Sequence, residues 1–129
     1  MSIIKNILKT IALFAIVFSC TNNSASLQEQ DRYELEQLET EIEMLLSEEK
    51  CAENATCDFI AFGSKPCGGP WHYLVYSTSI NTELLKLKVA EYNNKEAIYN
   101  KKWSISSDCM AALPPKSAEC IDGICAAIY

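Results

Sequence analysis

The placement of cysteine constrains this chain more than any other feature. Six of its seven cysteines fall between residues 51 and 125, and the seventh, Cys20, stands apart near the start. An odd number is awkward for an exported protein, because one sulfur remains once the others have paired. We therefore expect Cys20 to serve a separate purpose from the group formed by Cys51, Cys57, Cys67, Cys109, Cys120 and Cys125.

The beginning of the chain has the composition of an export signal. Two lysines provide positive charge, residues 11–18 form an unbroken apolar run, and Ser19 places a small residue directly before Cys20. The apolar run is shorter than the roughly 20 residues that a permanent membrane-spanning helix requires. We expect residues 1–19 to be removed and the mature chain to have no membrane-spanning helix.

The tetrad Val17-Phe18-Ser19-Cys20 resembles the lipobox of bacterial lipoproteins. The resemblance implies that Cys20 is diacylated through a thioether, becomes the first residue of the mature protein and anchors it in a lipid membrane. In bacteria with two membranes, Thr21 in place of an aspartate after the cysteine favours the outer membrane, facing the periplasm or the cell surface. The alternative is an ordinary signal cleaved near Ser26, which would discard Cys20.

Export would place the six later cysteines in an oxidising compartment, where paired thiols persist. Three disulfides are then expected, each stabilising the fold by about 2–4 kcal/mol. Six cysteines allow fifteen connectivities, and the sequence alone does not choose between them.

The length of 129 residues is that of one domain with appendages. We expect a signal at residues 1–19, a polar tether at 20–30 and one domain at 31–129.

The formal net charge of −6 argues against a nucleic-acid partner, because phosphate binding depends on Lys and Arg.

Two segments have the spacing of amphipathic helices. Residues 31–49 lack Gly and Pro and carry apolar residues three or four positions apart, namely Leu35, Leu38, Ile42 and Leu45. Their many glutamates are typical of a solvated face, or of a surface for a basic partner. A second helix is predicted after the capping residues 78–81 and runs to about Lys102, with Leu85, Val89, Tyr92 and Tyr99 on one side. It is rich in lysine, so the two helices are candidates to lie side by side.

Short strands are predicted at residues 59–62 and 71–76, separated by a loop rich in Gly and Pro at 63–70. Later, the sequence Ile121-Asp122-Gly123-Ile124 indicates a two-residue hairpin. This turn would place Cys120 opposite Cys125. A direct bond between them is allowed, but we favour bonds from each to Cys51, Cys57 or Cys67, which would join the hairpin to the earlier strands. Together the elements predict a small disulfide-stabilised α+β domain, with an antiparallel sheet and two helices.

No catalytic or cofactor motif stands out in the sequence. Any acid–base mechanism would use His72, the only histidine, or an acid such as Asp58 in a pocket. We favour the interpretation of His72 as a half-exposed strand residue that alternates with core aromatics. The cysteine spacings are wider than those of zinc ribbons, so we expect neither a metal nor another cofactor.

Two loops combine proline with lysine near a cysteine. Lys65 precedes Pro66, and Lys116 follows Pro114 and Pro115. Rigid loops of this kind lose little entropy on binding, and small protease inhibitors use them to fill a pocket of basic specificity. One hypothesis is therefore an inhibitor of an extracytoplasmic hydrolase, either a protease or a lysozyme.

The segment from residue 51 to residue 125 resembles small cysteine-rich exported bacterial proteins. This resemblance supports a single cysteine-rich domain and implies no particular activity. Its motifs are Cys-Gly-Gly-Pro-Trp from Cys67 and Cys-Ile-Asp-Gly-Ile-Cys from Cys120. The leading expectation is a membrane-tethered, non-enzymatic module that binds a protein or another envelope component. A small hydrolase that uses His72 is the enzymatic alternative.

Overall fold

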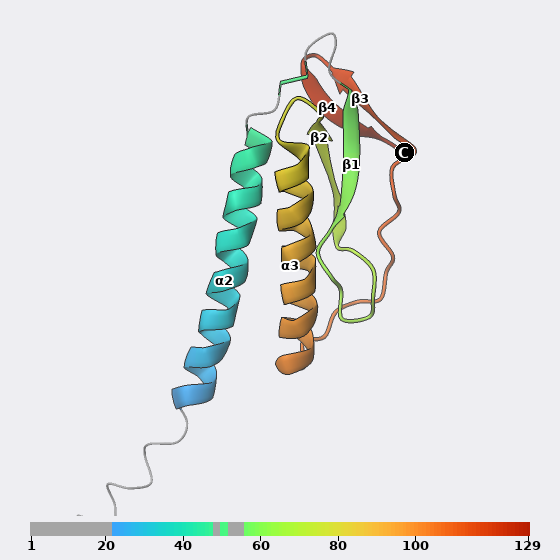
Figure 1. Cartoon of the computed structure of the whole chain (residues 1–129). Helices are drawn as coiled ribbons and strands as arrows, with labels where there is room; N and C mark the ends of the chain where they lie inside the picture. The colour runs from blue at the N-terminus through green and yellow to red at the C-terminus, as the bar shows by residue number, and fades with distance from the viewer. Residues whose placement is uncertain (1–21, 48–49, 52–55) are drawn as a thin grey trace, which may run out of the picture. The chain divides into compact units, whose positions relative to one another are not determined.

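The computed structural model describes residues 22–47, 50–51 and 56–129. Its elements follow the order α2, β1, β2, α3, β3, β4 (Figure 1). The chain divides into two units, residues 1–31 and 32–129. The predicted signal and the predicted lipid site at Cys20 lie outside the described residues. Within the described part, no helix is both long enough and apolar enough to cross a membrane.

Helix α2 spans Asn22–Ser47 and therefore begins nine residues before the predicted start at Asp31. The residues from 22 to 30, expected to form only a polar tether, are helical. Their polarity indicates contact with water but does not prevent helix formation, because no Gly or Pro interrupts the segment. The last two residues of the predicted helix, 48 and 49, lie outside the described residues.

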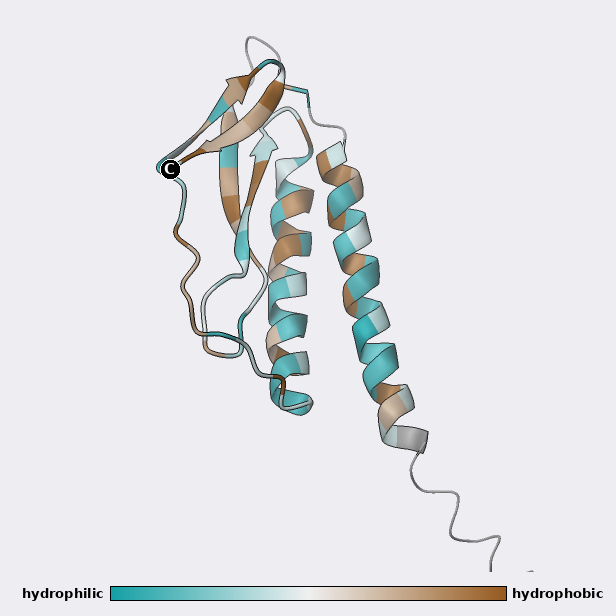
Figure 2. Cartoon of the chain, turned by 180° about the vertical axis from the view of Figure 1, so that it is seen from behind, coloured by the Kyte–Doolittle hydropathy of each residue, from teal (hydrophilic) through white to brown (hydrophobic). Residues whose placement is uncertain are grey.

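The predicted apolar stripe of α2 is confirmed. Leu35, Leu38 and Ile42 are buried in the core of the second unit, and Leu45 packs against them. Hydrophilic residues predominate over the rest of the helix, whereas hydrophobic residues gather in the β3–β4 hairpin (Figure 2).

Strands β1 (Cys57–Phe62) and β2 (His72–Ser77) form an antiparallel pair, as predicted. Cys57 pairs with Ser77 at the open end of this hairpin, and Phe62 pairs with His72 next to the loop. Phe62 and Tyr76 contribute buried rings to the core. Burial of the Tyr76 hydroxyl and its hydrogen bond to Asp58 raise the pKa of Tyr76 to about 12.

Helix α3 spans Thr82–Lys102. It begins where the sequence predicts, because the side chain of Asn81 accepts a hydrogen bond from the backbone N–H of Leu84. Its C-terminus is closed by a hydrogen bond from the N–H of Ile105 to the carbonyl of Asn100, with Ser104 in the left-handed region at φ 52°. This arrangement is a Schellman motif in which serine occupies the position that glycine usually takes.

One side of α3 completes the core. Leu85, Val89 and Tyr92 are buried, and Tyr99 packs against the same cluster. Lys88 forms an ion pair with Glu41 of α2, and Lys95 forms one with Glu34 at 3.1 Å. The predicted proximity of the acidic and the basic helix is thus confirmed, although such partly exposed pairs contribute only about 0.2–1 kcal/mol each.

Strands β3 (Ser117–Ile121) and β4 (Ile124–Ile128) form the predicted hairpin. Asp122 and Gly123 occupy its turn with φ values of 53° and 81°. Positive φ at both central positions defines the turn type that matches the twist of paired strands. Cys120 lies opposite Cys125, as expected.

The six cysteines form three disulfides, and the favoured mode of pairing is confirmed. The bonds are Cys51–Cys120, Cys57–Cys125 and Cys67–Cys109. The first two join the β3–β4 hairpin to the segment around β1 instead of linking the two hairpin strands to each other. The described residues therefore form a small disulfide-stabilised α+β domain, and within them there are two helices and two antiparallel two-stranded sheets.

Candidate functional site

Helix α3 holds the end of β1 through a row of polar side chains. Asn93 accepts a hydrogen bond from the N–H of Gly63 at 2.7 Å and donates one to the carbonyl of Ala61 at 3.1 Å. Asn100, which is 8% exposed, donates to the carbonyl of Ser64 at 2.7 Å. Glu96 accepts from the N–H of Ser64. These bonds fix the path of the chain as it leaves the strand.

Gly63 is required at this position for two reasons. Its φ of 81° lies in the left-handed region, and a Cβ atom built on it would lie 2.2 Å from Cδ1 of Trp71. Trp71 is in turn fixed because its indole N–H donates to Glu96 at 2.9 Å. Glycine thus allows the tryptophan ring to pack directly over the backbone.

The structure changes the interpretation of Lys65, one of the two lysines predicted to enter a partner's pocket. Its side chain is only 8% exposed, and its ammonium group donates to Asp108 Oδ1 at 2.9 Å and to the carbonyl of Met110 at 2.7 Å. It also lies 5.1 Å from the centre of a Trp71 ring. The hydrogen bond from Lys65 holds the pKa of Asp108 below its ordinary value. Lys65 therefore fastens two loops together and is not available to a partner.

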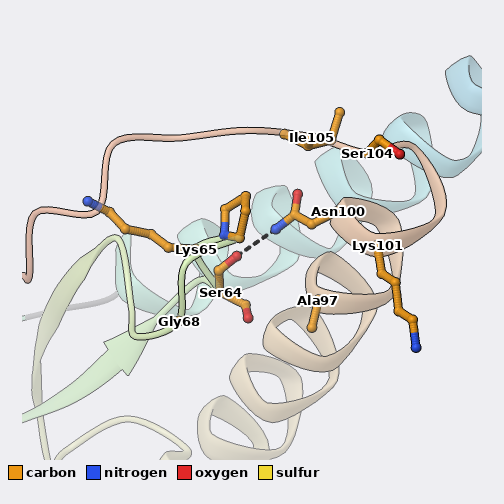
Figure 3. A pocket seen from close by; sticks show the side chains of 9 residues that line it. Ser64, Lys65, Gly68, Ala97, Asn100, Lys101, Ser104 and Ile105 are labelled. Atoms are coloured by element: carbon orange, nitrogen blue, oxygen red, sulfur yellow. Dashed lines mark hydrogen bonds between the residues drawn. The ribbon is translucent and has the colours of Figure 1, made fainter.

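A pocket of about 470 Å³ lies beside this contact. Its lining comes from the loop after β1 and from the end of α3, and consists of Ser64, Lys65, Pro66, Gly68, Ala97, Asn100, Lys101, Ser104 and Ile105. In Figure 3 the Lys65 and Lys101 side chains extend in different directions, and Asn100 points to Ser64. Pro66, the second residue predicted for this loop, is exposed at the rim.

His72 and Asp58 do not line this pocket, and the strand register keeps them apart. His72 pairs with Phe62 beside the loop, whereas Asp58 pairs with Tyr76 near the open end of the hairpin. The exposed His72 ring packs 5.3 Å from the Phe62 ring. Asp58 accepts hydrogen bonds from the Tyr76 hydroxyl and from the N–H of Phe59. The structure thus gives both residues contacts within the β1–β2 hairpin.

A feature that the sequence analysis missed is the segment of residues 109–116, which we call the strap. It connects the disulfide at Cys109 with the start of β3, and all of it except Lys116 belongs to a stretch, residues 105–115, without helix, strand, turn or bend (Figure 1). Met110 and Leu113 are 76% and 74% exposed. The only sequence signal was the apolar composition of residues 110–113 next to two prolines.

The other proposed binding-loop residues lie at the end of the strap. Pro114 is exposed and Pro115 is buried. The Lys116 side chain is exposed, while its backbone N–H donates to the carbonyl of Ile128 at 2.7 Å. This bond ties the backbone just before β3 to the end of β4, while the Lys116 side chain stays exposed.

The disulfides near the β3–β4 hairpin lie close together. The sulfurs of Cys51, Cys57 and Cys125 are within 4.8 Å of one another. Each is bonded to a second cysteine, so none of them is a thiolate that could ligate a metal. Comparisons of the chain with protein-family models, curated proteins and solved structures found no match.

Proposed function

We propose that this chain is a lipid-anchored protein of the bacterial cell envelope, in which a disulfide-stabilised, non-enzymatic domain binds a protein or another envelope component. One observation carries the proposal. All six cysteines after Cys20 pair with one another, so that Cys20 is the odd sulfur. That pairing agrees with an oxidising compartment, and the sequence around Cys20 resembles a lipobox.

Acylation of Cys20 would supply the membrane attachment. Each methylene of an acyl chain buried in the bilayer contributes about 0.8 kcal/mol, so two or more chains give stable anchoring. Thr21 favours the outer membrane as the destination. The polar residues that begin α2 would then separate the domain from the lipid surface.

The strap supports a binding role for the domain. Large apolar side chains exposed on a covalently fixed segment cost free energy in water, and a protein partner would cover them. Because the segment is held by a disulfide, it loses little conformational entropy when it is bound.

Labelling with a palmitate analogue in a bacterial host tests the anchoring. We expect the full chain to incorporate the label and Cys20→Ala to lose it completely, while Thr21→Ala serves as the matched control and retains it. Binding is tested separately with a photocrosslinking residue at position 113 of the anchored protein. Absence of label from the unaltered chain would refute the lipid anchor, and absence of any specific crosslinked product would refute the binding role.

A further inference from the structure

Two disulfides lie next to each other at the open end of the β1–β2 hairpin. The sulfurs of Cys51, Cys57 and Cys125 are all within 4.8 Å of one another, although only the last two are bonded together. Cys51 is bonded to Cys120. Thiol–disulfide exchange proceeds by attack of a thiolate on a disulfide sulfur, so it requires the two to be close. Here a sulfur of one disulfide lies beside both sulfurs of another.

The bond between Cys51 and Cys120 is accessible from one side. Cys120 is exposed, whereas Cys51 is 5% exposed. A small external thiolate would therefore attack Cys120, form a mixed disulfide with it and leave the electron pair of the broken bond on the Cys51 sulfur. The backbone N–H of Cys51 donates to the carbonyl of Gly123 at 3.2 Å, so the new thiolate would stay beside the neighbouring disulfide.

The strand register selects the next step. Attack of the Cys51 thiolate on Cys57 would release Cys125, which lies directly opposite Cys120 in the β3–β4 pair. The Cα atoms of directly opposite residues are about 4.5–5.5 Å apart, which is within the range of disulfides. Cys125 would then displace the external thiol and close a bond across the hairpin. Attack on Cys125 would instead release Cys57, which belongs to the other strand pair.

We propose that the four cysteines at the open end form a thiol–disulfide exchange site, at which a small aliphatic thiol attacks Cys120. The exchange replaces Cys51–Cys120 and Cys57–Cys125 by Cys51–Cys57 and Cys120–Cys125. One external thiolate enters in the first step and leaves in the last, so the thiol acts as a catalyst and nothing is oxidised or reduced overall.

The pairing seen in the structure remains the major one. Its two bonds span 69 and 68 positions of the sequence, whereas the alternative bonds would close loops of only a few residues. A disulfide that closes a long loop restricts the unfolded chain more, and therefore stabilises the fold more. The alternative pairing is a minor form in which the β3–β4 hairpin is no longer covalently joined to the segment around β1.

The disulfide at the loop end, Cys67–Cys109, lacks this arrangement, although both of its cysteines are exposed. Neither of its sulfurs belongs to the close group of three found among the described residues. A thiolate released there has its former partner within reach and returns to it. Exposure alone therefore does not create an exchange site.

A free thiol at Cys51 tests the inference. Cys120→Ala leaves Cys51 unpaired beside the Cys57–Cys125 bond, and Cys20→Ser in every chain removes the seventh sulfur. The oxidised full chain is kept at mildly alkaline pH and then treated with N-ethylmaleimide in acidic denaturant, where exchange is slow. Peptide mass analysis locates the label. We expect at least about 5% of it at Cys125, with Cys51 bonded to Cys57.

Cys67→Ala is the matched control, because it leaves Cys109 unpaired at the loop end. All of its label should lie on Cys109. In Cys120→Ala, label confined to Cys51 or Cys57, or label that also spreads to the loop-end cysteines, would overturn the inference.

A second measurement keeps all six cysteines and adds a catalytic amount of glutathione to the chain that carries only Cys20→Ser. Cleavage at Glu53 and Asp122 places the four open-end cysteines on different peptides, so that mass analysis distinguishes the two pairings. We expect a minor Cys120–Cys125 product that is absent without glutathione. Its absence after treatment would overturn the inference even if Cys120→Ala does not fold.

Discussion

The two ends of the β1–β2 hairpin are both closed by disulfides, but they are stabilised differently. At the open end, Cys57–Cys125 and Cys51–Cys120 lie beside each other, and Cys51 and Cys125 are only 5% and 9% exposed. At the loop end, both cysteines of the third disulfide, Cys67–Cys109, are exposed. At this end the loop is held in addition by hydrogen bonds from Asn93 and Asn100 of α3 and by the ion pair between Lys65 and Asp108. The comparison indicates that one end stabilises the fold and the other presents the strap.

The largest effect is expected from removing a disulfide at the open end. Cys57→Ala with Cys125→Ala should lower the free energy of unfolding by about 4–5 kcal/mol, mainly because the buried Cys125 position loses its packing together with its bond, while Cys51–Cys120 still closes nearly the same loop. Cys67→Ala with Cys109→Ala should cost less, about 3–4 kcal/mol, because both positions are exposed. Urea denaturation of both double variants measures the difference. A larger loss at the loop end would reverse the comparison.

An intermediate effect is expected at Gly63, within the loop end. Gly63→Ala should cost about 3 kcal/mol, since the new methyl group meets Trp71 and the positive φ is strained. Gly69→Ala is the matched control: its φ is also 81°, but nothing lies within 4 Å of its added Cβ. It should cost about 1 kcal/mol, from backbone strain alone. Equal losses in thermal denaturation would show that packing against Trp71 contributes nothing.

The smallest effect is expected at Asp108, where the strap meets Lys65. The pKa of Asp108 is lowered in the folded state, so the stabilisation that the pair provides is present above the ordinary Asp pKa and is lost as the pH falls through the lowered value. Asp108→Asn should therefore reduce the melting temperature slightly at neutral pH and not at all in strong acid. Titration by NMR should show the pKa of Asp108 rising in Lys65→Met. An unchanged pKa in that variant would contradict the pairing.

Local signals predicted much of the fold. The Asp122-Gly123 pair specified the second hairpin, Asn81 marked the start of α3, and the spacing of Leu35, Leu38 and Ile42 identified the buried stripe of α2. Each of these features depends on residues within a few positions of one another. The start of α2 was predicted too late, because the polar composition of residues 22–30 is typical of a tether but is equally compatible with an exposed helix.

The candidate site could not be predicted in the same way, because its contacts join distant parts of the chain. The position of Lys65 beside Pro66 predicts an exposed lysine, but the fold brings its ammonium group to Asp108, 43 residues later. The bonds from Asn93 and Asn100 to the backbone beyond β1 have no local signature. The strap is held at Cys109 by a disulfide to Cys67 and at Lys116 by a hydrogen bond to Ile128. Both partners are distant in the sequence, so these contacts could not be predicted from local patterns.

The proposed lipid anchor and the stability of the domain both depend on how the seven cysteine sulfurs are divided between acylation and disulfides. Intact-mass and thiol analysis of the protein purified from its native host tests this directly. We expect a mature chain that begins at a diacylated Cys20 and has no free thiol among the other six cysteines. An unmodified start downstream of residue 20, or free thiols within residues 51–125, would contradict it.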